Sequence, residues 1–419
     1  MTDKAAQLIS DFKTSGWHTT NLYERLFNLA SNSNDAFAFA SKFLYTFDKN
    51  ATIFNDILSY IDQPQFDELI SIAVEILTKQ KNENAESVIE YASLQFPELL
   101  HQHLRLIFEL KPNEYTYFEA YPWRNLAMDV IPIFKNLFIS AETSIKDKQA
   151  LFERLMETRN LEVIIFAHDY TLKNKLFDED DLEDYLLAYL ELVGFTKRQG
   201  RIETYCPNVL RHFSFPKNYF VNDRPSHLNK QQHPTWNLKA DENTYKFGGV
   251  IDNHTNNRFM HLITFDQIPD GLQISDLSTL TLGMHIRELN EYGAVFYQHD
   301  ENGQPSKIGE LKNIEIYSDL PIQETFVSFS ASPDRWFYQS WGSANSRENL
   351  FRLGGEPSWI QSAEVLICPI SGEKMDFLMQ LDTDLPNTEN GEVYFGSGGI
   401  CYVFWCDKTK VSGYIMQCT

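Results

Sequence analysis

Apolar residues recur at helical spacing through the first half of the chain. Phe66, Leu69, Ile70, Ala73 and Leu77 show this spacing clearly, and Pro64 lies where the first turn of a helix accepts proline. Similar amphipathic segments lie near residues 19–31, 35–47, 83–95, 124–139, 145–157, 160–175 and 180–193. Short polar breaks separate them, and no fixed-period motif recurs, so we predict an irregular array of antiparallel helices.

The second half has a different pattern, in which short runs of β-branched and aromatic residues alternate with Gly, Pro, Asn and Asp. The runs are MHLITF, GAVFYQ, ETFVSFS, AEVLICP, MDFLMQL, GEVYF, GICYVFWC and VSGYIMQC. They predict eight or more strands, mostly antiparallel. The last two runs are close enough to form a hairpin across residues 407–410.

The residues that interrupt helices are unevenly distributed along the chain. Residues 1–200 contain 3 of the 19 Gly, 5 of the 16 Pro and none of the 5 Cys. Helix interiors avoid Gly and Pro, whereas β turns use both. We therefore predict an α+β protein, with the helical array over residues 1–197 and a β-rich domain over residues 198–419. The boundary is expected in the non-periodic stretch 194–207.

Charge and hydropathy exclude several classes of protein. The chain has 36 Lys and Arg against 58 Asp and Glu, a formal charge of −22, which excludes a general binder of phosphate backbones. Its 43% hydrophobic content excludes disorder as the main state. No segment resembles a signal peptide or reaches the roughly 18 apolar residues of a spanning helix. We predict a cytoplasmic protein with neither a nucleic-acid nor a membrane partner.

The cysteines do not form a recognisable metal motif. No Cys-x-x-Cys pair is present, and in Cys368-Pro-Ile-Ser-Gly a serine, Ser371, takes the place of the second thiolate of a zinc knuckle. Cys401 and Cys406 lie five apart on one predicted strand, so they point to opposite faces. Five cysteines in a chain of this length are also too few for a disulfide framework. We predict reduced thiols, no metal and no cofactor.

Catalytic motifs are equally sparse. His254, His261, His285 and His299 lie within one stretch near Asp252, but their spacing favours separately bonded histidines over a catalytic or metal cluster. There is no Gly-x-Ser-x-Gly elbow, and the glycine-rich segments at 352–357 and 395–400 lack the features of a phosphate-binding loop. We therefore predict a protein that is not an enzyme.

The acidic run at residues 178–184 has two interpretations. Carboxylates in the first turn of a helix complement the helix dipole, and this is the first interpretation. The second is a surface for a partner. Tryptophans 236, 336, 341, 359 and 405 pack a β core or mark a binding hot spot. The candidate partner-binding residues are Asp178, Glu179, Asp180, Asp181, Glu183, Asp184 and Trp359.

Three segments of the β-rich half carry a family resemblance. They are LGGEPSWIQ at 353–361, CPISGEKMDFLMQLDTDLP at 368–386 and FGSGGICYVFWCD at 395–407. Residues 350–419 resemble the bacterial YwqG-like domain of unknown function, which is distantly similar to the carboxy-terminal part of programmed cell death protein 2. Residues 248–266 and 296–300 resemble a further β segment of larger relatives and extend the resemblance to about residue 235.

This chain departs from the family at the positions where relatives carry paired cysteines. It has residues 252–254 (Asp-Asn-His), residues 284–285 (Met-His), Ser371 and Thr409 there. The resemblance implies a former zinc site in which packing has replaced the metal.

The resemblance also implies a binding role. YwqG-like proteins are grouped with immunity proteins that neutralise secreted bacterial toxins, and programmed cell death protein 2 resembles a chaperone of a basic ribosomal protein. Residues 1–200 carry a net charge of −12 and the rest −10, so both halves suit a basic partner. We expect a non-catalytic immunity protein. The alternatives are a chaperone of a basic client, or an enzyme with an interdomain cleft that uses His254, Asp252 and His285.

Overall fold

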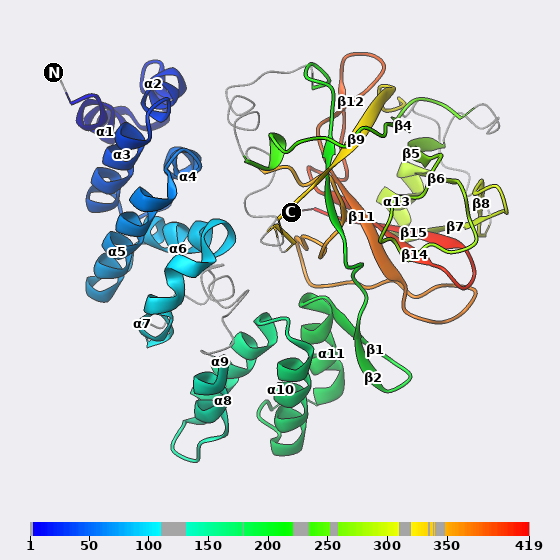
Figure 1. Cartoon of the computed structure of the whole chain (residues 1–419), viewed down its shortest axis with the longest axis horizontal. Coiled ribbons are helices and arrows are strands. Elements are labelled where there is room, and N and C mark those ends of the chain that lie inside the picture. The colour runs from blue at the N-terminus through cyan, green and yellow to red at the C-terminus, as the bar shows by residue number, and fades with distance from the viewer. Residues whose placement is uncertain are drawn as a thin grey trace. The chain divides into compact units, whose positions relative to one another are not determined.

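A computed structural model describes residues 3–109, 131–178, 180–220, 234–251, 259–309, 320–333, 336–337, 339 and 348–418. The chain forms two compact units, Met1–Leu182 and Glu183–Thr419. Helices make up the first and a large antiparallel sheet dominates the second (Figure 1), so the predicted α+β class is confirmed. The predicted boundary at residues 197 and 198 lies inside a short β-hairpin, β1 (Phe195–Arg198) with β2 (Arg201–Thr204).

The first unit is an irregular array in which helices pack against neighbours in the chain, as α5 does on α6 and α9 on α10. Helices α1, α4 and α7 come in addition to the predicted segments. The helices are α1 (Lys4–Ser15), α2 (Leu22–Ala30), α3 (Ser33–Thr46), α4 (Thr52–Leu58), α5 (Gln63–Lys79), α6 (Glu83–Gln95), α7 (Leu104–Glu109), α8 (Ile131–Ile139), α9 (Ile145–Glu157) and α10 (Leu161–Asn174).

The polar breaks between these helices supply their N-caps. Five polar side chains each accept a hydrogen bond from a backbone N–H in the first turn of the helix that follows. They belong to Asn32, Asp62, Asn82, Ser144 and Asn160. These bonds satisfy donors that a helix leaves unpaired at its start. The breaks therefore fix where each helix begins, and the apolar stripes between them form the buried core of the unit.

Helix α11 (Leu182–Leu192) crosses the boundary between the units. The second unit contains, in the described part of the chain, one sheet of eleven antiparallel strands in the order β6-β5-β4-β9-β3-β10-β11-β14-β15-β7-β8. Its strands are β3 (Leu210–Ser214), β4 (Tyr245–Phe247), β5 (Met260–Phe265), β6 (Leu280–Met284), β7 (Val295–His299), β8 (Pro305–Lys307), β9 (Thr325–Ala331), β10 (Arg352–Gly354), β11 (Asp376–Asp382), β14 (Ile400–Cys406) and β15 (Val411–Gln417).

The sheet curls until its two ends meet. Strand β6 is at one edge, and the turn between β7 and β8 is at the other. The backbone N–H of Thr281 donates to the carbonyl of Gly303 at 2.9 Å, and the Thr279 hydroxyl donates to the carbonyl of Asn302 at 2.7 Å. These bonds join the two edges of the sheet. A short helix, α13 (Ile286–Tyr292), packs against β7 and β15.

Two of the strand predictions have clear outcomes. The hairpin across residues 407–410 is confirmed, because β14 and β15 pair from Ile400 with Gln417 to Cys406 with Val411. The strand predicted for AEVLICP is wrong, because within it only Ile367 forms a bridge, to Lys374. This segment instead packs its buried side chains, Val365, Leu366 and Cys368, against one face of the sheet.

Strand β14 separates two hydrophobic cores. Cys401, Val403 and Trp405 face the larger core, which contains Phe213, Phe247 and Tyr414, whereas Tyr402, Phe404 and Cys406 face the smaller core, which contains Tyr205 and Phe377. All seven residues of β14 are buried. The prediction that Cys401 and Cys406 point to opposite faces is therefore confirmed.

None of the helices that the structure describes is long and apolar enough to cross a membrane.

Gly354, at the end of β10, provides a test of how closely the backbone packs around this strand. Its φ is +71°, and a Cβ added there would lie 2.0 Å from the carbonyl oxygen of Val209. We expect Gly354→Ala to lower the free energy of unfolding by about 3 kcal/mol or more. Two costs add, because alanine is strained at this positive φ and its Cβ clashes with the carbonyl of Val209. Gly372 has the same φ with no atom within 4 Å of the added Cβ, so Gly372→Ala should cost about 1 kcal/mol. Urea unfolding of both variants measures the difference, and equal losses would contradict it.

Candidate functional site

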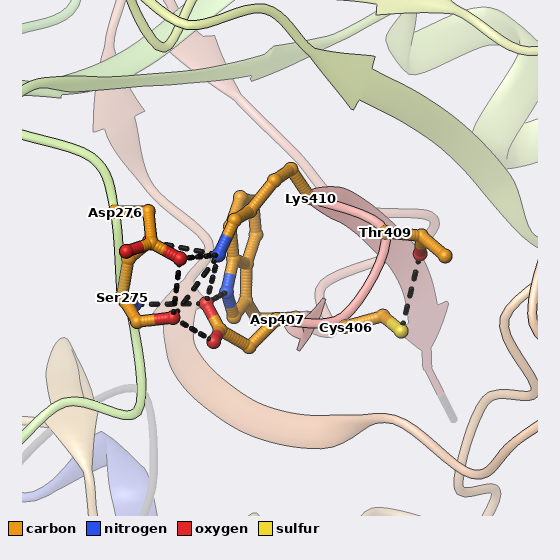
Figure 2. A network of polar contacts seen from close by, with 7 residues as sticks. Ser275, Asp276, Cys406, Asp407, Thr409 and Lys410 are labelled. Atoms are coloured by element: carbon orange, nitrogen blue, oxygen red, sulfur yellow. Dashed lines mark hydrogen bonds and ion pairs between the residues drawn. The ribbon is translucent and has the colours of Figure 1, made fainter.

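Four side chains from two distant segments form a thiol–hydroxyl cluster at the end of the β14–β15 hairpin. The Thr409 hydroxyl lies 3.2 Å from the sulfur of Cys368 and 3.2 Å from the sulfur of Cys406. The Ser371 hydroxyl lies 3.5 Å from the sulfur of Cys406. Figure 2 shows the contact between Cys406 and Thr409 in the hairpin turn. We call Cys368, Ser371, Cys406 and Thr409 the thiol–hydroxyl cluster.

Both segments of the cluster are tight turns of the form Cys-x-x-Ser/Thr. The residue after each turn has a positive φ, +71° at Gly372 and +51° at Lys410. In the first turn the Gly372 N–H donates to the carbonyl of Cys368 at 2.9 Å, and the Ser371 N–H points to the Cys368 sulfur at 3.5 Å. Such a turn places side chains i and i+3 next to each other. Both thiols are buried, while Ser371 and Thr409 are half-buried and lie nearer to solvent.

The environment of Cys368 favours its thiolate form. Burial alone raises the pKa of this thiol, but hydrogen bonds from Ser371 and Thr409 outweigh burial and lower the pKa to about 7. Cys401, which lies in the larger core without such donors, has its pKa raised well above the usual range by burial. The cluster therefore offers one thiol that ionises near neutral pH.

The opposite side of the same hairpin turn is clamped by a carboxylate. Asp407 accepts hydrogen bonds from the backbone N–H of Ser275 at 2.8 Å, from Trp405 Nε1 at 3.2 Å and from Lys410 Nζ at 2.9 Å (Figure 2). Burial raises the pKa of Asp407, but hydrogen bonds from Ser275 and Lys410 outweigh it and the pKa is lowered. The charged carboxylate ties the turn to the loop that contains Ser275 and so fixes the position of Cys406 and Thr409.

The histidines are bonded one by one. The rings of His261 and His299 donate from Nδ1 to the carbonyls of Gly248 and Gly303, and their Nε2 atoms lie 2.9 Å and 2.8 Å from a threonine and a serine hydroxyl. His285 lies against Tyr297, with its Nδ1 beside the phenol. The interpretation as separately bonded histidines is confirmed for these three. His254 and Asp252, the other members of the alternative catalytic set, lie outside the described residues.

Among the residues that the structure describes, no three His, Cys, Asp or Glu side chains come together as a metal site. The five cysteines, all of them described, are free thiols. The thiol–hydroxyl cluster provides two sulfur atoms and two neutral hydroxyls, and a hydroxyl is a poor ligand for zinc.

A serine–histidine–glutamine chain of hydrogen bonds through the buried His212 was not predicted. His212 Nδ1 contacts the Ser332 hydroxyl, and His212 Nε2 lies 2.8 Å from Gln339 Oε1. Burial, together with the charge of Arg352, lowers the pKa of His212 to about 3, so this ring is a weak general base. His212 lies 120 positions from Ser332 and 127 from Gln339 in sequence, without a shared motif. No sequence signal points to them.

The predicted acidic surface lies in the loop before α11 and in its first turn. Asp178, Asp180, Asp181, Glu183 and Asp184 are all exposed, and Glu179 lies outside the described residues. Glu183 and Asp184 occupy the first turn of the helix, as the dipole interpretation predicts.

Trp359, the remaining candidate, is half-buried. Its ring lies 4.6 Å from that of Tyr402 and stacks on Phe404 at 6.2 Å, so one face of the indole packs on the smaller core.

No family model, no curated protein and no solved structure matches this chain. The resemblance to the YwqG-like family therefore stays a prediction from the residues quoted above.

The buried histidines predict how stability depends on pH. Burial lowers the pKa of His212 to about 3 and that of His299 to about 4, against about 6.5 in the unfolded chain. Below pH 6.5 the unfolded chain binds protons that the folded chain does not. Stability that is complete above pH 6.5 should therefore fall by about 1.4 kcal/mol per pH unit for each ring as the pH drops towards 4.

The His299→Gln variant should reduce this slope by about the contribution of one ring, since glutamine retains hydrogen-bonding groups but does not titrate. Urea unfolding of the unaltered chain and of His299→Gln between pH 4 and 7.5 measures the two slopes. An unaltered slope in His299→Gln would contradict the assignment.

Proposed function

We propose that this chain is a non-catalytic binding protein for a basic protein partner, of the kind that neutralises a toxin. The observation that supports the proposal is the exposed acidic segment of Asp178, Asp180, Asp181, Glu183 and Asp184, in a chain whose charge is −22. We call these five residues the acidic segment. Clustered carboxylates on an exposed surface attract a cationic partner and accelerate its association.

The helix dipole explains only part of this segment. Glu183 and Asp184 lie in the first turn of α11, where the dipole stabilises carboxylates. Asp178 and Asp180 precede the helix and are exposed. Like charges repel one another, and a basic partner would supply the opposite charge for these exposed carboxylates.

The chemistry of the β unit supports binding over catalysis. His261 and His299 use both ring nitrogens for hydrogen bonds inside the core, and the low pKa of His212 disfavours Ser332 as an activated nucleophile. The alternative enzyme with an interdomain cleft relies on His254 and Asp252, which are not among the described residues. The resemblance of residues 350–419 to YwqG-like proteins agrees with an immunity role.

A chaperone of a basic client is the second candidate. The two differ in the state of the partner, because an immunity protein binds a folded toxin whereas a chaperone binds a nascent or unfolded chain. Co-expression with the product of a neighbouring toxin gene, scored as rescue of growth and as a co-purified complex, tests the immunity role. Absence of both rescue and complex at physiological salt would overturn it.

Charge reversal tests the acidic segment directly. In the variant D178K/D180K/E183K each substitution adds two charges, so the net charge changes from −22 to −16. We expect association with the basic partner to slow by about ten- to a hundredfold at low salt, with a smaller effect at high salt, because steering is screened. Stopped-flow or surface-plasmon measurements at several salt concentrations give the rates.

The matched control is D270K/E301K/E389K, which makes the same change in net charge at exposed positions of the β unit. This control should slow association less than the first variant. Equal effects would show that net charge alone steers the partner, and would remove the acidic segment as the binding site.

A further inference from the structure

The two turns of the thiol–hydroxyl cluster have the construction of a pair of zinc knuckles. Each contains two donor side chains separated by two residues, and each is followed by a residue with positive φ, Gly372 or Lys410. In the first turn a backbone N–H points at the cysteine sulfur, which stabilises a thiolate. Spacing of two residues between donors is the spacing that structural zinc sites use.

The distances within the cluster also agree with four ligands around one ion. The three thiol–hydroxyl separations are 3.2, 3.2 and 3.5 Å. Four thiolates bound to zinc at about 2.3 Å lie roughly 3.8 Å apart at the corners of a tetrahedron. Exchanging the two hydroxyl oxygens for larger sulfur atoms thus requires only small movements of the turns.

The donor set, however, does not suit a structural zinc ion. Zinc in such sites is held by thiolates or imidazoles, and here Ser371 and Thr409 supply neutral hydroxyls at two of the four positions. Those hydroxyls instead bond to the thiols. Thr409 contacts both sulfurs and thereby joins the segment at 368–371 to the hairpin.

We infer that hydrogen bonds from Ser371 and Thr409 hold this knuckle pair together in place of a metal, and that the double substitution S371C/T409C completes a four-thiolate zinc site. The inference is independent of the proposed binding function, since it concerns a cluster whose thiols are buried. In the double variant, zinc is the ligand and these two turns supply the whole site.

Metal analysis after purification, zinc loading and gel filtration under reducing conditions tests the inference. The unaltered chain should retain less than a tenth of an equivalent of zinc, and S371C/T409C should retain one equivalent. With Co²⁺ as the probe, the double variant should show the visible absorption bands of a tetrahedral thiolate site. Zinc should also raise its midpoint of thermal unfolding, and a chelator should reverse the rise.

The variant C368S/S371C/C406S/T409C is the matched control. It exchanges thiols and hydroxyls within the cluster, so it keeps two of each and should retain as little zinc as the unaltered chain. Circular dichroism establishes that each variant is folded, and mass spectrometry identifies any disulfide. A folded, reduced S371C/T409C without zinc would overturn the inference, and so would one equivalent of zinc in the unaltered chain or in the matched control.

Discussion

A buried guanidinium orders the centre of the β unit. Arg352 is fully buried, and its N–H groups donate to the carbonyls of Trp336 at 3.0 Å and Glu356 at 2.5 Å, to the Ser358 hydroxyl at 2.8 Å and to Gln380 Oε1 at 3.1 Å. Burial lowers its pKa only to about 10, so the group stays charged at neutral pH. A buried charge is costly unless its donors are paired. The loop at 354–358 is therefore held against β11.

This constraint extends to the candidate site through β14. The Tyr402 hydroxyl donates to the carbonyl of Ser358 at 2.7 Å, so the loop that Arg352 orders is bonded to the central strand. Because every residue of β14 is buried between two cores, the strand has no freedom to slide. The turn that follows it, with Cys406 and Thr409, is consequently delivered to Cys368 in a fixed position.

Local pattern predicted most of the elements, because helical spacing and strand alternation depend on near neighbours. It succeeded for the stripe Phe66, Leu69, Ile70 and Ala73, which is buried, and for the hairpin after β14. It failed for AEVLICP. This segment has the composition of a strand, but apart from the bridge at Ile367 it packs its side chains against the smaller core without pairing as a strand. It recognised one half of the knuckle, at Cys368. The other half was indicated only by the family resemblance at Thr409, and the tertiary structure shows that the two turns come together.

The two features that carry chemistry in this protein differ in their exposure, and this decides their roles. The thiols of Cys368 and Cys406 are buried. The cluster therefore stabilises contacts within the β unit, and its sulfurs are not accessible to a partner. The acidic segment is exposed and contributes repulsion to its own chain. Under our proposal, a basic partner binds these exposed carboxylates around the start of α11. The cluster, in contrast, ties the segment at 368–371 to the β14–β15 hairpin.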